Sequence, residues 1–138
     1  MEQGGAMHDA AGLQVLARDE CLRLLGSTAV GRLVYTDRAL PVVHPVVYVL
    51  DGECVVLRVP EGSATLVARD TIVAFQIDEV APDLSKGWSV MGVGHVTEVD
   101  DEHRLTRLRR LPLPSRGWGD HDHYLVVDLE VLSGRRIP

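Results

Sequence analysis

The 138-residue chain is poor in lysine, cysteine, aromatic residues and long apolar runs, and each shortage bears on the class of protein it can be. It has a single lysine beside 13 arginines, and its 20 acidic residues outnumber its 14 basic ones, which gives a formal net charge of -6. A protein of that sign repels a phosphate backbone, so no nucleic-acid partner is expected. No apolar run approaches the roughly 20 residues that a membrane-spanning helix needs, so no membrane partner is expected either.

Cysteine is also scarce, since only Cys21 and Cys54 are present, and both lie among apolar residues. Such cysteines are typical of buried free thiols in a reducing compartment, so a cytoplasmic protein is expected; a disulfide or a redox role is the alternative. Residues 1–12 lack the basic region and the apolar region that a secretory signal has. They are predicted to form a flexible tail ahead of a single domain over residues 13–138.

Aromatic residues number only 6, whereas valine occurs 21 times and leucine 18 times. Enrichment in a β-branched residue favours a core built from sheets. A domain of this size has one modest core, with little interior left for a large cofactor.

The order of predicted elements indicates a barrel. Apolar alternation predicts strands, Asp51-Gly52 predicts a tight hairpin, and the glycines at 87, 92 and 94 suggest a bulge, a barrel corner or a close approach. No strand–helix–strand alternation is present, so a small closed or partly closed barrel with peripheral helices is expected. The predicted strands span residues 29–35, 42–50, 53–59, 71–80, 87–99 and 123–132, and the predicted helices span 18–25, 63–69 and 100–111.

The segment from Arg58 to Ser63 is the best candidate for an anion site. A strand ends there, a tight turn follows, and a helix begins at Ser63. The free N–H groups of the first turn, the Ser63 hydroxyl and the Arg58 guanidinium would suit a phosphate monoester. A capped helix beside a surface arginine is the alternative interpretation.

Two other positions interrupt otherwise regular strands. Trp88 precedes the glycine-rich strand and either lines a slot for a flat aromatic ligand or is a core or interface tryptophan. His44-Pro45 lies inside an apolar strand, and proline cannot donate to a strand ladder, so this strand is predicted to be at an edge or bulged there. Its unpaired backbone groups would then be free for a ligand.

Motifs of other chemistries are lacking. The sequence has no nucleophile elbow, no P-loop and no dinucleotide-binding glycine fingerprint. His121 and His123 would share one face of a strand, but no third ligand has a clear source, so no metal site is expected.

Six segments in order resemble the pyridoxamine 5'-phosphate oxidase-like proteins, especially the branch that includes nitroimidazole-reductase-like proteins. The resemblance covers nearly the whole chain from about Leu13. The segments are the helix end and VGRL of residues 25–33, the PVVHPVVY of 41–48, the turn and phosphate segment of 51–63, the VAFQID of 73–78, the GWSVMGVG of 87–94 and the SGRRI of 133–137.

This resemblance implies an FMN-binding-type split β-barrel that works as a homodimer, with flavin mononucleotide in two equivalent grooves between subunits. Position by position, it implies that the cofactor is bound by His44, Pro45, Val46 and Val47 along the flavin ring, by Arg58 and Ser63 at the phosphate, and by Trp88 and Ser89, from the partner subunit in one arrangement. Val59 and Thr65 are also cofactor-binding positions by this resemblance, although many relatives have threonine at the position of Val59 and lysine at that of Ala64. Thr65 would partly replace the lost phosphate donors.

The resemblance therefore implies an FMN-dependent oxidoreductase that acts on an unidentified small-molecule substrate, with the flavin carrying the chemistry. No side chain is an evident general acid or base; His44 is the best candidate if one is needed. The alternatives are an F420-dependent reductase on the same fold, or a non-catalytic flavin-binding, haem-binding or sensor protein.

Overall fold

Eight strands carry the fold in the computed structural model, which describes residues 7–113 and 122–138. Two α-helices, α1 (Arg18–Leu25) and α2 (Glu102–Leu108), and the 3-10 helix η1 (Ala64–Ala68) accompany them. The strands are β1 (Gln14–Val15), β2 (Val30–Asp37), β3 (Leu40–Asp51), β4 (Cys54–Val59), β5 (Ile72–Val80), β6 (Gly87–Glu98), β7 (His123–Asp128) and β8 (Val131–Arg136).

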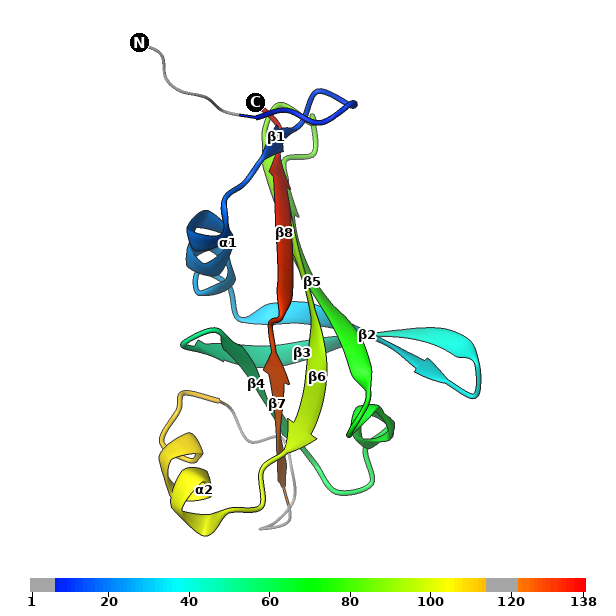
Figure 1. Ribbon diagram of the computed structural model, residues 1–138, viewed down its shortest axis with the longest axis vertical. Helices are drawn as coiled ribbons and strands as arrows, with labels where there is room; N and C mark the ends of the chain where they lie inside the picture. Colours follow the sequence, from blue (N-terminus) through cyan, green and yellow to red (C-terminus); the bar gives the residue numbers. More distant parts are fainter. Residues whose placement is uncertain (1–6, 114–121) are drawn as a thin grey trace.

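Six of the strands close into an antiparallel barrel in the order β6-β5-β2-β3-β4-β7, because β7 pairs with β6 as well as with β4. β8 pairs with the other half of β6, and the short β1 pairs with β8. In Figure 1, β5, β6 and β8 run along the long axis of the molecule and cross β2 and β3, which run sideways. The predicted mainly β barrel with peripheral helices is confirmed.

The single strand predicted over residues 123–132 is wrong, because the structure divides it into β7 and β8. β7 pairs with the end of β6 and β8 with its first half. At the step between them, the Asp128 carbonyl oxygen lies 1.4 Å from the place where a Cβ on Gly94 would stand. Only glycine permits this approach, so the expectation that a strand glycine marks a close approach is confirmed at Gly94.

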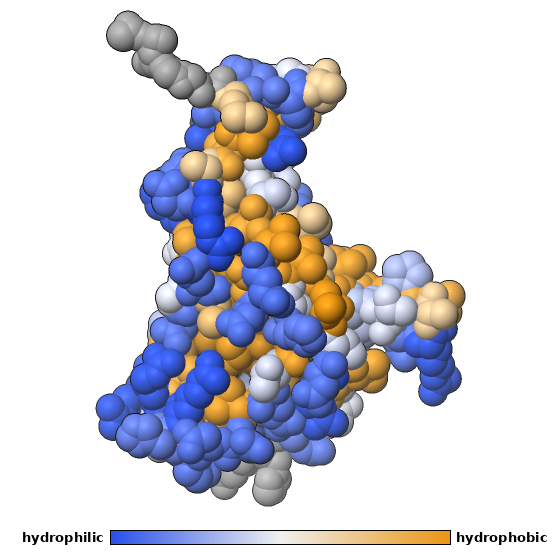
Figure 2. Space-filling view, viewed as in Figure 1, coloured by the Kyte–Doolittle hydropathy of each residue, from blue (hydrophilic) through white to orange (hydrophobic). Residues whose placement is uncertain are grey.

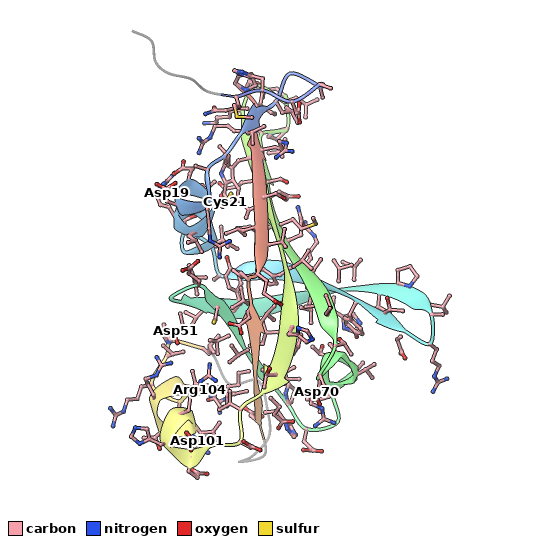
Figure 3. All side chains as sticks on the ribbon, viewed as in Figure 1. Asp19, Cys21, Asp51, Asp70, Asp101 and Arg104 are labelled. Carbon is pink, nitrogen blue, oxygen red and sulfur yellow. The ribbon has the colours of Figure 1, made fainter. Side chains whose placement is uncertain are left out.

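The interior of the barrel is filled by alternate residues of its strands. Leu33, Phe75 and Leu125 are fully buried there, and β2 alternates between exposed and buried positions as a strand with one inner face does. Helix α1 adds Cys21, Leu24 and Leu25 to this core, and Cys21 lies on the side of α1 that faces β8 (Figure 3). A second apolar cluster packs α2 against the outside of β4 and β7, through Leu108, Val56 and Val126 among others.

The predicted helices are present: α1 has the predicted bounds of residues 18–25, and the other two are shorter than expected. The helix predicted over residues 100–111 is α2, and Asp101 caps it by accepting the Arg104 N–H at 3.0 Å (Figure 3). The helix predicted over residues 63–69 is the 3-10 helix η1, capped by Ser63. The hairpin at Asp51-Gly52 is confirmed, since β3 and β4 join there and Gly52 has a φ of 63°.

The tail predicted over residues 1–12 stays a prediction, since residues 1–6 lie outside the described part of the chain. Residues 7–12 form a turn in which the Asp9 carboxylate accepts hydrogen bonds from the Ala11 N–H and from the Arg135 Nε. In the described residues, no helix is long and apolar enough to cross a bilayer.

Neither cysteine is in a disulfide, and only one of them is fully buried. Cys21 is buried in the core, whereas Cys54 is partly exposed, contrary to the expectation of two buried thiols. Cys54 begins β4 at the barrel surface, and its thiol donates to the Asp128 carboxylate at 2.9 Å. Burial and this carboxylate raise the pKa of Cys54 to about 11, so it is a thiol rather than a thiolate at neutral pH.

A Gly94→Ala substitution is expected to lower the free energy of unfolding by about 3 kcal/mol or more, because the backbone of Asp128 has to move. Gly26→Ala is the matched control, since its Cβ would meet nothing closer than 3.6 Å and its φ is -74°. Urea denaturation followed by circular dichroism measures both. A Gly94→Ala variant as stable as Gly26→Ala would show that the barrel does not depend on this approach.

Candidate functional site

A cleft of about 380 Å³ lies beside the barrel, between the middle of β3, the end of β4 and the segment that leads into η1. It gathers most of the site residues predicted from the sequence. Those that line it are Pro45, Val46, Val47, Arg58, Val59, Ser63 and Thr65, and Val30, Leu57, Pro60 and Leu113 complete the lining.

The apolar wall of the cleft is a strand edge. Residues 40–47 of β3 pair with β2, and residues 48–51 pair with β4, so in the described part of the chain the first half of β3 has a neighbour on one side only. Pro45 lies in this half, where its lack of an N–H interrupts no second ladder. The edge position predicted from His44-Pro45 is therefore confirmed, and backbone groups there are open to a ligand.

Arg58 supplies the cationic side of the cleft. It is the penultimate residue of β4, and its side chain is 26% exposed. Its Nε donates to the Asp122 carboxylate at 2.6 Å, and its guanidinium carbon lies 5.8 Å from the centroid of the Tyr124 ring. Its two terminal nitrogens make no hydrogen bond with the described residues, so they remain as a donor pair while Asp122 offsets part of the charge.

Ser63 and Thr65 present hydroxyl groups to the same cleft. The Ser63 hydroxyl oxygen accepts the Thr65 N–H at 3.2 Å, which leaves the Ser63 proton available for an anion. The backbone N–H groups of Ser63 and Leu66 donate to the carbonyls of Pro60 and Ser63. The expectation of free N–H groups in this first turn is thus wrong for these residues, because a 3-10 turn uses its own carbonyls.

His44 contacts the cleft through Thr65. Its Nδ1 lies 3.1 Å from the Tyr35 hydroxyl and 3.4 Å from the Thr65 hydroxyl oxygen. The Tyr35 and His44 rings are edge to face, with centroids 5.5 Å apart. Burial, and secondarily Asp37, raise the pKa of Tyr35, so its hydroxyl keeps its proton.

Tyr35 is a site residue that the sequence reasoning missed. Its position on the inner face of β2, two residues beyond Leu33, was a usable signal, because a buried phenol needs a hydrogen-bond partner nearby.

Trp88 and Ser89 are not brought to this cleft within one chain. They lie at the start of β6, opposite Arg136 and Arg135 of β8. Trp88 instead lines a separate hollow of about 440 Å³, together with Glu79, Lys86 and Arg136. Their contact with a cofactor therefore stays a prediction that requires a partner subunit.

A histidine beside two carboxylates fixes the turn below the cleft. His123, the first residue of β7, bonds through Nδ1 to Glu98 and through Nε2 to Glu61, and Arg69 also reaches Glu98 at 2.8 Å. The two carboxylates raise the pKa of His123, and His123 and Arg69 lower that of Glu98. Because Glu61 lies in the turn before Ser63, this cluster ties that turn to β6 and β7. His121, which was weighed as a metal ligand with His123, lies outside the described residues.

Comparison with known proteins identifies the family. The model of the pyridoxamine 5'-phosphate oxidase family matches residues 17–136. The chain belongs to this family. It is 34% identical over 130 residues to the uncharacterized protein Rv0080 of Mycobacterium tuberculosis, with 88% of this chain and 84% of the relative covered.

Solved structures of similar fold place this member of the pyridoxamine 5'-phosphate oxidase family among flavin-binding neighbours. The FAD binding protein from Mycobacterium smegmatis is 30% identical, with a TM-score of 0.77 over 90% of this chain and 99% of the neighbour. An FAD-binding protein of Mesorhizobium loti shares the fold at 22% identity, with a TM-score of 0.72 over 91% and 99% of the two chains. The predicted split-barrel class is confirmed.

The His123 cluster gives this family member a pH-dependent stability. The folded-state pKa of His123 is raised above its usual 6.5, so the stabilisation is fully present below pH 6.5 and is lost as the pH rises through the folded-state value. A His123→Gln variant is therefore expected to be less stable than the native protein at pH 6, by a margin that shrinks at pH 9. Urea denaturation at both pH values measures this margin.

His103→Gln is the control, since His103 is exposed on α2 and pairs with no carboxylate among the described residues. A margin for His123→Gln that is the same at pH 6 and pH 9 would contradict the assignment.

Proposed function

We propose that this chain is an FMN-dependent oxidoreductase that acts on a small molecule, with the flavin in the cleft beside β3 and β4. One observation carries the proposal: the cleft joins a set of anion donors to a flat apolar strand edge. Arg58, Ser63 and Thr65 form the donor set, and Pro45 to Val47 form the edge. A phosphate monoester on a flat ring system has both of these chemical features.

The donor set suits a phosphate, although it differs from that of many relatives. A guanidinium and two hydroxyls replace a set that elsewhere includes a lysine and a further threonine, because Ala64 and Val59 stand at those positions here. Arginine and hydroxyl donors bind phosphate oxygens well. FAD is the second candidate, supported by the FAD binding protein from Mycobacterium smegmatis at 30% identity.

In this function the protein would bind and orient the cofactor and the substrate, and the cofactor would carry out the reaction. A bound flavin supplies hydride transfer at its ring. The donor set would hold the phosphate, and the β3 edge would orient the ring through its free backbone groups and through apolar contact with Pro45 and Val46. Val30, Leu57 and Leu113 would keep water from the apolar side of the cleft.

We further propose that the working unit is a homodimer. Several large apolar side chains are exposed in the single chain, and Figure 2 shows apolar residues gathered over the middle of one face, where the vertical strands cross β2. The exposed apolar side chains of the described residues include Val30, Val43, Ile72, Met91 and Val131. A partner would cover such a surface and would bring its Trp88 and Ser89 toward the cleft.

Titration of the purified protein with FMN, FAD and F420 in separate experiments tests the cofactor. FMN is expected to bind, and an Arg58→Ala variant is expected to bind it about 10-fold or more weakly, because hydrogen bonds to charged groups contribute about 1.5–3 kcal/mol. Arg32→Ala is the control, since Arg32 bonds to Gln76 and is not part of the cleft lining. Turnover with a reduced nicotinamide and candidate acceptors then tests the oxidoreductase.

If the protein bound FAD or F420 more tightly than FMN, that compound would be the cofactor instead of FMN. Binding without turnover would instead indicate a sensor or carrier, and binding of none of the three would refute a flavin function.

The dimer proposal predicts a mass of twice 15.1 kDa by sedimentation equilibrium. In a Trp118→Phe variant, Trp88 is the only tryptophan, and its fluorescence is expected to be quenched when FMN binds, because the partner's Trp88 would lie near the flavin. A monomer that binds FMN without quenching would contradict both the dimer and this placement of Trp88.

A further inference from the structure

Three side chains from three separate elements meet behind the cleft. Tyr35 comes from β2, His44 from β3 and Thr65 from η1. The His44 Nδ1 lies within hydrogen-bond distance of both hydroxyls, at 3.1 Å from Tyr35 and 3.4 Å from Thr65. Thr65 is only 7% exposed and yet lines the cleft, so its hydroxyl group has few directions in which to donate.

The state of Nδ1 decides where the Thr65 proton points. A histidine nitrogen that carries a hydrogen donates to the Thr65 oxygen, and the Thr65 proton is then free to turn to the cleft. A nitrogen without a hydrogen accepts the Thr65 proton instead and leaves no donor for a ligand. As long as the Tyr35 hydroxyl does not donate to Nδ1, Thr65 is therefore a phosphate donor only when His44 carries its hydrogen on Nδ1.

Tyr35 favours that arrangement. Its O–H reaches the Ala64 carbonyl at 3.4 Å, and a hydroxyl that donates there offers its lone pairs to the His44 Nδ1 hydrogen, which the Tyr35 and Thr65 oxygens then share as acceptors. The edge-to-face packing of the two rings holds the imidazole in this orientation. Because Ala64 directly precedes Thr65, the same contact fixes the backbone that carries the Thr65 hydroxyl.

We propose that His44 is a positioning residue for the phosphate end of the cleft: its Nδ1–H, held by Tyr35, turns the Thr65 proton toward a bound phosphate. This inference rests on the proposed flavin function and deepens it. It differs from the expectation of the resemblance, which places His44 along the flavin ring. It also gives the chain a means to compensate in part for the donors absent at Val59 and Ala64, since one well-oriented hydroxyl restores one of the lost hydrogen bonds.

Comparison of FMN with riboflavin tests the assignment, because the two ligands share the ring and the ribityl chain and differ in the phosphate. Dissociation constants for both are measured by flavin fluorescence with the native protein and with His44→Ala, His44→Asn, Thr65→Val and the His44→Ala/Thr65→Val double variant. Circular dichroism and thermal unfolding confirm that each variant is folded.

His44→Ala and Thr65→Val are each expected to weaken FMN binding about 10-fold and to leave riboflavin binding within about twofold of native. The double variant is expected to be no worse than Thr65→Val alone, because both substitutions remove the same hydrogen bond to phosphate. His44→Asn is expected to restore most of the FMN affinity, since its amide N–H takes the place of Nδ1–H.

Equal loss of FMN and riboflavin in His44→Ala would assign the histidine to the flavin ring and overturn the proposal. Additive losses in the double variant would show that the two residues act separately and would overturn it as well. A native protein that binds neither ligand would refute the flavin function itself, which is a different result from either. If His44→Ala does not fold, His44→Phe takes its place in the same comparison of FMN with riboflavin, because phenylalanine keeps a ring at this position and lacks the Nδ1–H.

Discussion

The whole structure depends on one close approach of backbone to backbone at Gly94. There β6 passes from its pairing with β8 to its pairing with β7, and the Asp128 carbonyl occupies the space of a side chain. Without that approach β7 could not reach β6, and the six strands would form an open sheet rather than a barrel. The same step aims β7 along β4, so that Tyr124 and Asp122 come to lie beside Arg58. Closure of the barrel and construction of the cationic side of the cleft are thus consequences of a single glycine.

β3 divides its pairing in a similar way, and the cleft results from this division. Its second half pairs with β4, whereas its first half pairs with β2 alone among the described strands. The free edge created at the division faces the segment that leads from β4 into η1. A groove between a strand edge and a capped turn needs no interior volume, so the proposed cofactor site is compatible with the small core of this valine-rich chain.

Much of the architecture could be predicted from local patterns. Asp51-Gly52 marks a hairpin through its turn chemistry, Ser63 marks a helix start through its capping, and Pro45 marks a strand edge through its missing N–H. The break between β7 and β8 could not be predicted, because residues 123–132 form one mainly apolar run without glycine or proline and only the position of β6 divides them. The partners of Arg58 and His123 also could not be predicted, since Asp122 lies 64 residues and Glu61 lies 62 residues away along the chain. Such pairings are set by strand register, which the sequence pattern does not encode beyond each hairpin.

The pairing of Arg58 with Asp122 has a consequence for the kind of ligand that the cleft retains. The Arg58 guanidinium is already paired with the Asp122 carboxylate, 2.6 Å from Nε, so part of its positive charge is neutralised before an anion binds. A singly charged carboxylate gains little from such a cation, whereas a phosphate with nearly two charges still gains from the two terminal nitrogens. In the proposed cofactor site, Asp122 would therefore discriminate against singly charged carboxylates and would weaken the hold of Arg58 on a bound phosphate.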